Sequence, residues 1–290
     1  MEQTNDKKGN KDQREGFIDI DKIFKKKGGK LYPLIPKFII RYIKHITHQD
    51  EINATINRNS EKMGLDFIGE LIENEFGADV HVVNPENLPA KGRYIVASNH
   101  PLGGLDGIAL MYAVGKKRKD IKFLANDLLL ELRNLKELFV PINKHGRSNY
   151  ESVKLIESVY KSDDLILIFP AGLVSRKQKG KIYDLTWKKS FITKAVQHNR
   201  DIIPVHIQGK NSKFFYNLAR FRKKIGLKFN IEMLYLPDEM FKQKGKSITI
   251  TFGKPIPNSI FTKEKTHHEW AQKVKQHVYS LPYNDKPFEP

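Results

Sequence analysis

The sequence contains no cysteine, and that absence excludes several kinds of chemistry. Disulfide bonds, iron–sulfur clusters, cysteine-ligated zinc and thiol nucleophiles all need a side chain that this chain does not have. Long apolar runs are also missing, since Lys37 and Arg41 interrupt the apolar residues 34–43 and a helix that crosses a bilayer needs about 20 apolar residues. Residues 1–14 are mostly polar and charged, so we expect no secretory signal peptide and a protein that stays in the cytoplasm.

Acidic residues are scarce relative to basic ones. The 290-residue chain has 33 Asp and Glu against 51 Lys and Arg, which gives a net charge of +18 at pH 7. Such a surplus favours a polyanionic partner, either nucleic acid or the surface of an anionic bilayer. Hydrophobic residues make up 39% of the sequence, which predicts a globular protein with a buried core rather than a disordered chain.

Common motifs for nucleotides, metals and serine hydrolysis are absent. No Gly-x-Gly-x-x-Gly follows a predicted strand, and Gly245-Lys246-Ser247 lacks the glycine five positions earlier that a phosphate-binding loop requires. No Gly-x-Ser-x-Gly sequence forms a nucleophile elbow. His45 and His48 lack a third ligand at helical spacing. We therefore expect no nucleotide cofactor and no metal site.

Composition divides the chain into four parts: a disordered tail (1–15), a basic helical segment (16–77), an α/β domain (78–282) and a C-terminal tail (283–290). Residues 22–49 carry eight Lys or Arg and no acid, interleaved with apolar residues. After Pro36 the apolar residues are three and four apart, which predicts an amphipathic helix. Such a helix can lie on an anionic membrane or pack on the core as an ordinary surface helix, and the pattern favours neither.

From residue 78 onward, short apolar runs alternate with helical patterns. This alternation is typical of an α/β fold with a mostly parallel central sheet flanked by helices. The predicted strands are residues 80–83, 94–97, 123–125, 139–142, 165–169, 202–207, 231–236 and 248–252. The predicted helices, with one that precedes the sheet, are residues 65–76, 105–114, 148–161, 186–198, 212–223 and 263–280.

The most informative stretch is residues 94–107. An apolar strand ends at Ser98, Asn99 and His100 follow it, and Asp106 lies early in the next predicted helix. Open α/β sheets place their sites at the carboxyl ends of strands. A carboxylate that binds one imidazole nitrogen fixes the tautomer and lets the other nitrogen accept a proton, so His100 and Asp106 can activate a hydroxyl group. The alternative is a plain strand-to-helix turn in which Asp106 only caps the helix.

Two further predicted strands also end in turn-forming and polar residues, which we expect to converge on the same edge of the sheet. The predicted strand 165–169 leads into a turn that is followed by a hydroxyl and a guanidinium group. The predicted strand 139–142 leads into a segment with two cations. For any single Lys or Arg, the alternative is a solvated surface charge. The residues concerned are Pro170, Gly172, Ser175 and Arg176 after the first strand, and Lys144 and Arg147 after the second.

In this order the stretches resemble the glycerolipid acyltransferase superfamily, whose members, like lysophosphatidic-acid acyltransferase, esterify a lysolipid with an acyl thioester. The resemblance covers residues 94–207, and its specific parts are the Asn-His and Asp block and the Phe169-Pro-x-Gly-x-x-Ser-Arg176 block. It implies that His100 removes the proton from the acceptor hydroxyl, that Asp106 holds the imidazole, and that no covalent acyl-enzyme forms. Backbone amides near Gly103, Gly104 or Gly172 are the candidates for stabilising the oxyanion.

Two departures from the superfamily pattern narrow the resemblance. The superfamily usually has four residues between the His and the Asp, whereas residues 101–105 make five here. Ala171 stands where the Phe-Pro-Glu-Gly-Thr-Arg-Ser block of the family has a Glu that helps to hold the polar head of the acceptor. Both departures are similar to a bacterial, hemolysin-like branch, some members of which acylate lyso-ornithine or lyso-glycine lipid. The resemblance therefore favours an amino-acid lysolipid over lysophosphatidic acid.

The resemblance also implies partners and contacts. The acyl donor is acyl carrier protein or coenzyme A thioester, with no other cofactor, and the enzyme lies peripherally on an anionic membrane at the cytoplasmic face of the inner membrane, with no nucleic acid bound. Basic clusters at residues 173–194 and 209–230 fit such a surface. Two other functions stay open: a nucleic-acid-binding protein and a thioester hydrolase that uses the same His–Asp pair. The residues expected to contact substrate are Asn99, Gly103, Gly104, Lys144, Arg147, Pro170, Gly172, Ser175 and Arg176.

Overall fold

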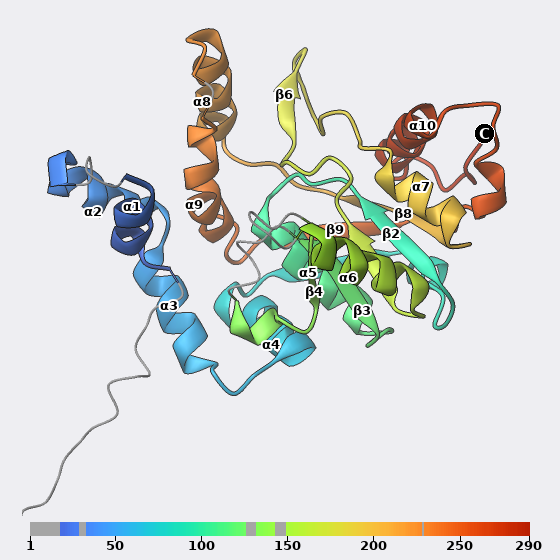
Figure 1. Ribbon diagram of the computed structural model, residues 1–290, viewed down its shortest axis with the longest axis horizontal. Coiled ribbons are helices and arrows are strands. Elements are labelled where there is room, and N and C mark those ends of the chain that lie inside the picture. Colours follow the sequence, from blue (N-terminus) through green and yellow to red (C-terminus); the bar gives the residue numbers. More distant parts are fainter. Residues whose placement is uncertain (1–17, 29–32, 126–131, 143–148, 228) are drawn as a thin grey trace, which may run out of the picture. The chain divides into compact units, whose positions relative to one another are not determined.

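The computed structural model describes residues 18–28, 33–125, 132–142, 149–227 and 229–290, and they form two compact units (Figure 1). The first unit ends at Arg58 and the second begins at Asn59. Residues 59–77, which the sequence groups with the basic helical segment, thus lie in the second unit. The reason is burial, since Phe67, Ile68 and Ile72 are almost inaccessible to solvent and their helix packs against a helix of the α/β fold.

Among its described residues, the first unit has three short α-helices, α1 (Ile20–Gly28), α2 (Lys37–Ile46) and α3 (Gln49–Arg58). Helix α2 begins directly after Pro36, as the spacing of apolar residues predicts. Ile40 and Ile43 of α2 pack with Ile20 of α1. Other apolar side chains of α2 face solvent, and Phe38 is 70% exposed. The helix therefore has a buried apolar face and an exposed apolar one.

The second unit is built on a seven-stranded sheet in the order β1-β9-β8-β2-β5-β3-β4. Five neighbouring pairs are parallel and the β8–β9 pair is antiparallel, which confirms the predicted, mostly parallel sheet. Because β2 and β5 are parallel neighbours with Ala97 opposite Ile168, the residues that follow them emerge at the same edge. The strands are β1 (Asp79–Val83), β2 (Tyr94–Ser98), β3 (Ile121–Ala125), β4 (Phe139–Pro141), β5 (Leu165–Ile168), β8 (Asp201–Ile207) and β9 (Ser247–Phe252).

Helices flank this sheet (Figure 1). Side chains of α6 (Asn149–Lys161), α7 (Ser190–Gln197) and α10 (His267–Ser280) form one core cluster with β2, β5 and β8, and Trp187 and Trp270 are fully buried in it. Helix α5 (Gly104–Gly115) packs against α4 (Gly64–Glu70), β1 and β9. The other helical segments are the π-helix η3 (Leu71–Glu75), the short 3₁₀ turns η4 (Pro85–Asn87), η6 (Arg133–Leu135) and η8 (Asn258–Ile260), and α8 (Lys213–Lys224), η7 (Ile231–Tyr235) and α9 (Leu236–Phe241).

One predicted strand is wrong. Of residues 231–236, the first five form the 3₁₀ helix η7 (Ile231–Tyr235), and Leu236 begins α9. Two residues explain the difference: Pro237 suits the first turn of a helix and has no N–H for a sheet, and Glu232 is fully buried because it pairs with arginines rather than facing a neighbouring strand. The apolar run of this segment is therefore a short helical one, which periodicity does not distinguish from a strand.

A hairpin that the sequence analysis missed follows β5. Strands β6 (Arg176–Gln178) and β7 (Lys181–Tyr183) pair antiparallel across a two-residue turn. Both turn residues, Lys179 and Gly180, have positive φ, as the turn of a tight hairpin requires. The Lys-Gly pair was the available signal. Helices α7 and α10 also begin four residues later than predicted, α10 at the cap formed by Thr266 and Glu269.

Candidate active site

His100 and Asp106 form a hydrogen-bonded pair at the carboxyl end of β2. The distance from His100 Nδ1 to Asp106 Oδ2 is 2.9 Å. His100 comes two residues after the strand ends and Asp106 lies in the first turn of α5, so the sheet and the helix each fix one partner. The bond occupies Nδ1, which leaves Nε2 as the nitrogen that can accept a proton from a substrate.

The Asp106 carboxylate is fully buried and binds three N–H groups through one oxygen. Besides His100, the backbone amides of Leu102 and Gly103 donate to Asp106 Oδ2 at 2.8 and 3.0 Å. Burial raises the pKa of Asp106, and the bonds from His100 and the two amides oppose that shift by favouring the charged form. The loop between the pair is therefore folded onto the carboxylate, and the carboxylate fixes the imidazole.

Phe169 forms one wall of the site. It follows β5 directly, and its ring stacks on the His100 imidazole with centroids 4.1 Å apart and planes 14° from parallel. Phe123 of β3 packs edge-on against Phe169. The His100 side chain is 17% exposed, so the imidazole is held between an aromatic wall and a carboxylate and still reaches solvent. Phe169 is the last residue of a predicted strand, and no local pattern in the sequence predicts its contact with His100.

Asp184 and Ser175 hold the main chain of His100. The Ser175 amide donates to the His100 carbonyl at 2.7 Å, and the His100 amide donates to Asp184 Oδ1 at 3.2 Å. The Ser175 hydroxyl donates to the same carboxylate oxygen at 2.6 Å, and the indole of Trp187 donates to Asp184 Oδ2 at 2.8 Å. A buried carboxylate thus connects the Phe169–Arg176 block to the backbone of the histidine, and sequence reasoning did not find Asp184.

Two expected substrate contacts are engaged within the protein. Asn99 is buried and exchanges two hydrogen bonds with the backbone of Ile207, at 2.9 and 2.7 Å, which ties the end of β2 to the end of β8. Arg176 is buried beside Glu232 at 3.1 Å, and Glu232 also binds Arg222 of α8 at 2.9 Å. Burial lowers the pKa of Arg176, and the charge of Glu232 opposes that shift. Their contact with a substrate stays a prediction.

Comparisons with known proteins show the family of this chain. A family profile described as acyltransferase matches residues 22–284. The chain belongs to the acyltransferase family. It is 52% identical to a lyso-glycine lipid O-acyltransferase of Bacteroides thetaiotaomicron over 91% of this chain and 97% of the relative, and 49% identical to one of Phocaeicola vulgatus over 91% and 95%. The crystal structure of the 1-acyl-sn-glycerophosphate acyltransferase of Thermotoga maritima matches 85% of this chain and 90% of its own at 19% identity, with a TM-score of 0.48.

The family match confirms the superfamily and the branch that the sequence resembles, and so confirms that this protein is an enzyme. Within the described residues, no helix is long and apolar enough to span a membrane. The same residues hold no group of three His, Cys, Asp or Glu side chains that could bind a metal ion.

The remaining predicted residues of this acyltransferase lie as follows. Gly103 has φ +91° and a methyl group there would lie 3.1 Å from Leu236, so this position needs glycine. Gly104 begins α5 and is exposed. Gly172 has φ +67° and its amide binds the Phe169 carbonyl, while the carbonyl of buried Pro170 accepts the Lys188 amide. Lys144 and Arg147 lie outside the described residues.

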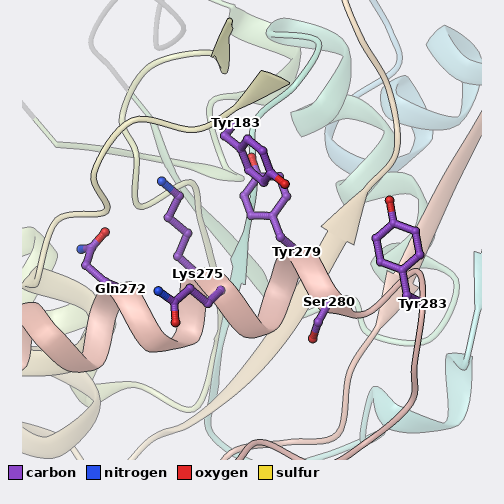
Figure 2. A pocket seen from close by; sticks show the side chains of 7 residues that line it. Tyr183, Gln272, Lys275, Tyr279, Ser280 and Tyr283 are labelled. Carbon is purple, nitrogen blue, oxygen red and sulfur yellow. The ribbon is translucent and has the colours of Figure 1, made fainter. Parts of the chain in front are cut away.

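A surface depression of about 600 Å³ lies beside α10 (Figure 2). The ring centroids of Tyr183 and Tyr279 are 4.6 Å apart in it. The Tyr279 hydroxyl accepts the Asp184 amide at 2.8 Å, and Lys275 Nζ donates to the carbonyls of Asp184 and Leu185 at 2.6 and 3.0 Å. Two side chains that line this depression thus bind the main chain of Asp184, whereas its carboxylate holds the His100 amide.

Proposed function

We propose that this acyltransferase moves a fatty acyl chain from a thioester to the hydroxyl group of a lysolipid, and that the acceptor is lyso-glycine lipid. The observation that carries the proposal is the His100–Asp106 pair at the carboxyl end of β2. Two relatives at 52% and 49% identity that are named for this reaction support the acceptor.

In the proposed mechanism, His100 is the general base. Nε2 takes the proton from the acceptor hydroxyl as its oxygen attacks the thioester carbonyl carbon, and Asp106 stabilises the resulting imidazolium through Nδ1–H. When the tetrahedral intermediate collapses, the carbon–sulfur bond breaks and the imidazolium returns the proton to the leaving thiolate. The reaction needs no covalent acyl-enzyme, no metal ion and no cofactor besides the thioester.

The backbone donors suggest which amide stabilises the oxyanion. The amides of Leu102 and Gly103 bind Asp106, and the amide of Gly172 binds Phe169. Gly104 is the first residue of α5, where the helix has no internal partner for an N–H group and the helix dipole favours negative charge. We assign the oxyanion donor to the Gly104 amide.

The acceptor preference is consistent with the surroundings of residue 171. Ala171 is buried in the apolar core cluster with Trp187 and Phe191, so no carboxylate extends from this position toward a polar head. The guanidinium of Arg176 instead pairs with Glu232, from a distant part of the chain. This arrangement favours an acceptor other than lysophosphatidic acid, in line with the amino-acid lipid of the relatives.

We further propose that the enzyme works peripherally at an anionic membrane, on the cytoplasmic face of the inner membrane. The first unit supports this idea because Leu34, Phe38 and Tyr42 are 75, 70 and 50% exposed, and the exposed cations Lys37 and Arg41 lie among them. Basic residues beside exposed apolar ones are typical of interfacial helices. Acyl carrier protein or coenzyme A supplies the acyl chain.

An acceptor screen tests this function. Purified enzyme is supplied with acyl-carrier-protein and coenzyme A thioesters and with lyso-glycine lipid, lyso-ornithine lipid or lysophosphatidic acid. We expect ester product with lyso-glycine lipid, none in His100→Ala, and a fall of about 100-fold or more in Asp106→Asn, which loses the charge that stabilises the imidazolium. Free fatty acid as the main product contradicts the proposal in favour of a thioester hydrolase. Ester formation unchanged in His100→Ala contradicts the mechanism.

A further inference from the structure

Helix α8 carries an apolar stripe on its exposed side. Phe215, Tyr216 and Ala219 face inward and are buried. Phe214, Phe221 and Ile225 are 49, 59 and 57% exposed, and with half-buried Leu218 they are four, three and four residues apart, which places them on one face. The chain continues past the helix with Leu227 and Phe229, which are 41 and 64% exposed. Isolated exposed apolar residues are ordinary, but a continuous stripe is typical of an interaction surface.

Basic residues lie beside this stripe, and acids do not. Lys213, Arg220, Lys223 and Lys224 are exposed on the same helix, and residues 209–230 contain no Asp or Glu. Of the acids in the adjoining η7 and α9, Glu232 and Glu239 are fully buried, and Glu239 binds the hydroxyl of Ser212 at the start of α8. Asp238 is half-buried and pairs with Lys242. The exposed side of α8 is therefore both apolar and cationic.

The inner face of α8 packs against residues that lie next to the active site. Glu232 joins Arg222 of α8 to Arg176 in one buried ion cluster. Phe215 and Tyr216 pack on Val174, and Leu236 packs on that cluster. A methyl group on Gly103 would contact both Leu236 and Val174, so the inner face of α8 is separated from the His–Asp loop by a single layer of side chains. Figure 1 shows the outer part of α8 standing away from the sheet.

We propose that the exposed face of α8, with Ile225, Leu227 and Phe229, docks the catalytic unit on the surface of an anionic lipid bilayer, with the apolar stripe in the interface and the cations at the lipid phosphates. That the docked site draws its lysolipid from the same bilayer rests on the proposed function. An acidic protein such as the carrier complements the charge equally well. We favour the bilayer because the apolar side chains of Phe221, Ile225 and Phe229 are more than half exposed on this face. Interfacial binding buries such apolar side chains at the membrane surface while the neighbouring cations contact anionic lipids.

Tryptophan fluorescence tests the docking directly. The chain has two tryptophans, Trp187 and Trp270, and both are fully buried, so a Phe221→Trp variant adds one exposed indole. The matched control is Tyr283→Trp, at a position that is 87% exposed and lies beside α10. Each full-length variant is mixed with vesicles of phosphatidylglycerol and phosphatidylcholine that contain brominated lipid. We expect a blue shift and quenching in Phe221→Trp and neither in Tyr283→Trp. No quenching in Phe221→Trp, or equal quenching in both, overturns the proposal.

A second test of docking reverses the charge of two cations on α8. Arg220→Glu with Lys224→Glu is compared with the equal reversal Lys254→Glu with Lys263→Glu, at exposed positions outside α8. Each cation near an anionic surface contributes roughly a factor of five to binding, so the α8 pair should lower vesicle binding by about tenfold or more and the control pair should not. If the α8 pair slows transfer from acyl carrier protein but leaves vesicle binding unchanged, the surface serves the carrier and the proposal fails. These vesicles contain no thioester, so the outcome is independent of whether the enzyme makes lyso-glycine ester.

Discussion

Replacing Gly104 by proline removes one N–H group from the active site and should leave the fold intact. Gly104 is the first residue of α5, where proline is well tolerated because its fixed φ suits a helix and the missing N–H has no partner in the helix. A residue that precedes proline must be extended. Gly103 meets this condition with φ 91° and ψ −130°, the mirror image of an extended conformation, which glycine adopts freely.

The expected loss follows from the other amides near His100. Those of Leu102, Gly103 and Gly172 are engaged with protein acceptors, so the Gly104→Pro variant loses the donor that we assign to the oxyanion. One such donor contributes about 3 to 4 kcal/mol to stabilisation of the transition state, or about 100- to 1,000-fold in kcat. Because the oxyanion forms only after attack, we expect KM to change little.

Gly104→Ala is the control for this variant. It keeps the amide, and its added methyl group would meet Met240 Sδ at 3.4 Å, an ordinary contact distance. We expect kcat within about threefold of the parent enzyme, since the donor is unchanged. Initial rates of ester formation give kcat and KM for both variants, and thermal unfolding checks that both are folded. A Gly104→Pro enzyme with the parent kcat, or an equal loss in Gly104→Ala, refutes the assignment.

Two further predictions concern residues behind the site. Burial lowers the pKa of His206 from 6.5 to about 4, so the folded state binds fewer protons than the unfolded state between these values. The contribution of neutral His206 to stability is complete above pH 6.5 and falls as pH decreases, by about 2 kcal/mol near pH 5. In urea unfolding, the His206→Phe variant should therefore lose less stability on acidification than the parent protein. An equal loss in both proteins argues against His206 as the source of the pH dependence. Asp184→Asn sets an amide NH2 against the N–H of either Trp187 or His100, which should cost about 1 to 3 kcal/mol of stability. The Asp184→Asn variant should also have a lower kcat with little change in KM. The Ser175→Ala variant retains its backbone bond to His100, so its kcat should fall less. If Asp184→Asn is destabilised but keeps the parent kcat, Asp184 has no part in positioning His100.

Local patterns predicted the elements whose residues lie close together in the chain. The helix after Pro36 and the strand before His100 were found because proline and apolar spacing act over a few residues. Residues 231–236 failed the same test, since their structure depends on Glu232 meeting Arg222 and Arg176. Partners that are 10 and 56 residues away in the chain outweighed a strand-like run of apolar residues, and no local pattern records such a pairing.

The same distinction applies to the active site. Asp106 could be predicted as the partner of His100 because the two are separated by a single loop. Asp184 could not, because its bond to the His100 amide joins residues 84 apart in the sequence. Ser175 and Arg176 were found as polar residues after a strand, but sequence cannot tell whether such a side chain faces a substrate or another part of the protein, and the contacts of both are internal.

The two adjacent glycines between His100 and Asp106 solve different problems. The backbone of His100 is fixed by Ser175 and Asp184 and Asp106 is fixed by α5, so the five-residue connection must fit between two rigid points. Gly103 makes that possible, because φ +91° and the nearby Leu236 side chain exclude a Cβ, and this conformation turns its amide and that of Leu102 onto the carboxylate. Gly104 has no such constraint on its backbone or its space. We therefore propose that it contributes its N–H at the start of the helix, so that Gly103 adjusts the chain path of the longer loop while Gly104 supplies the donor.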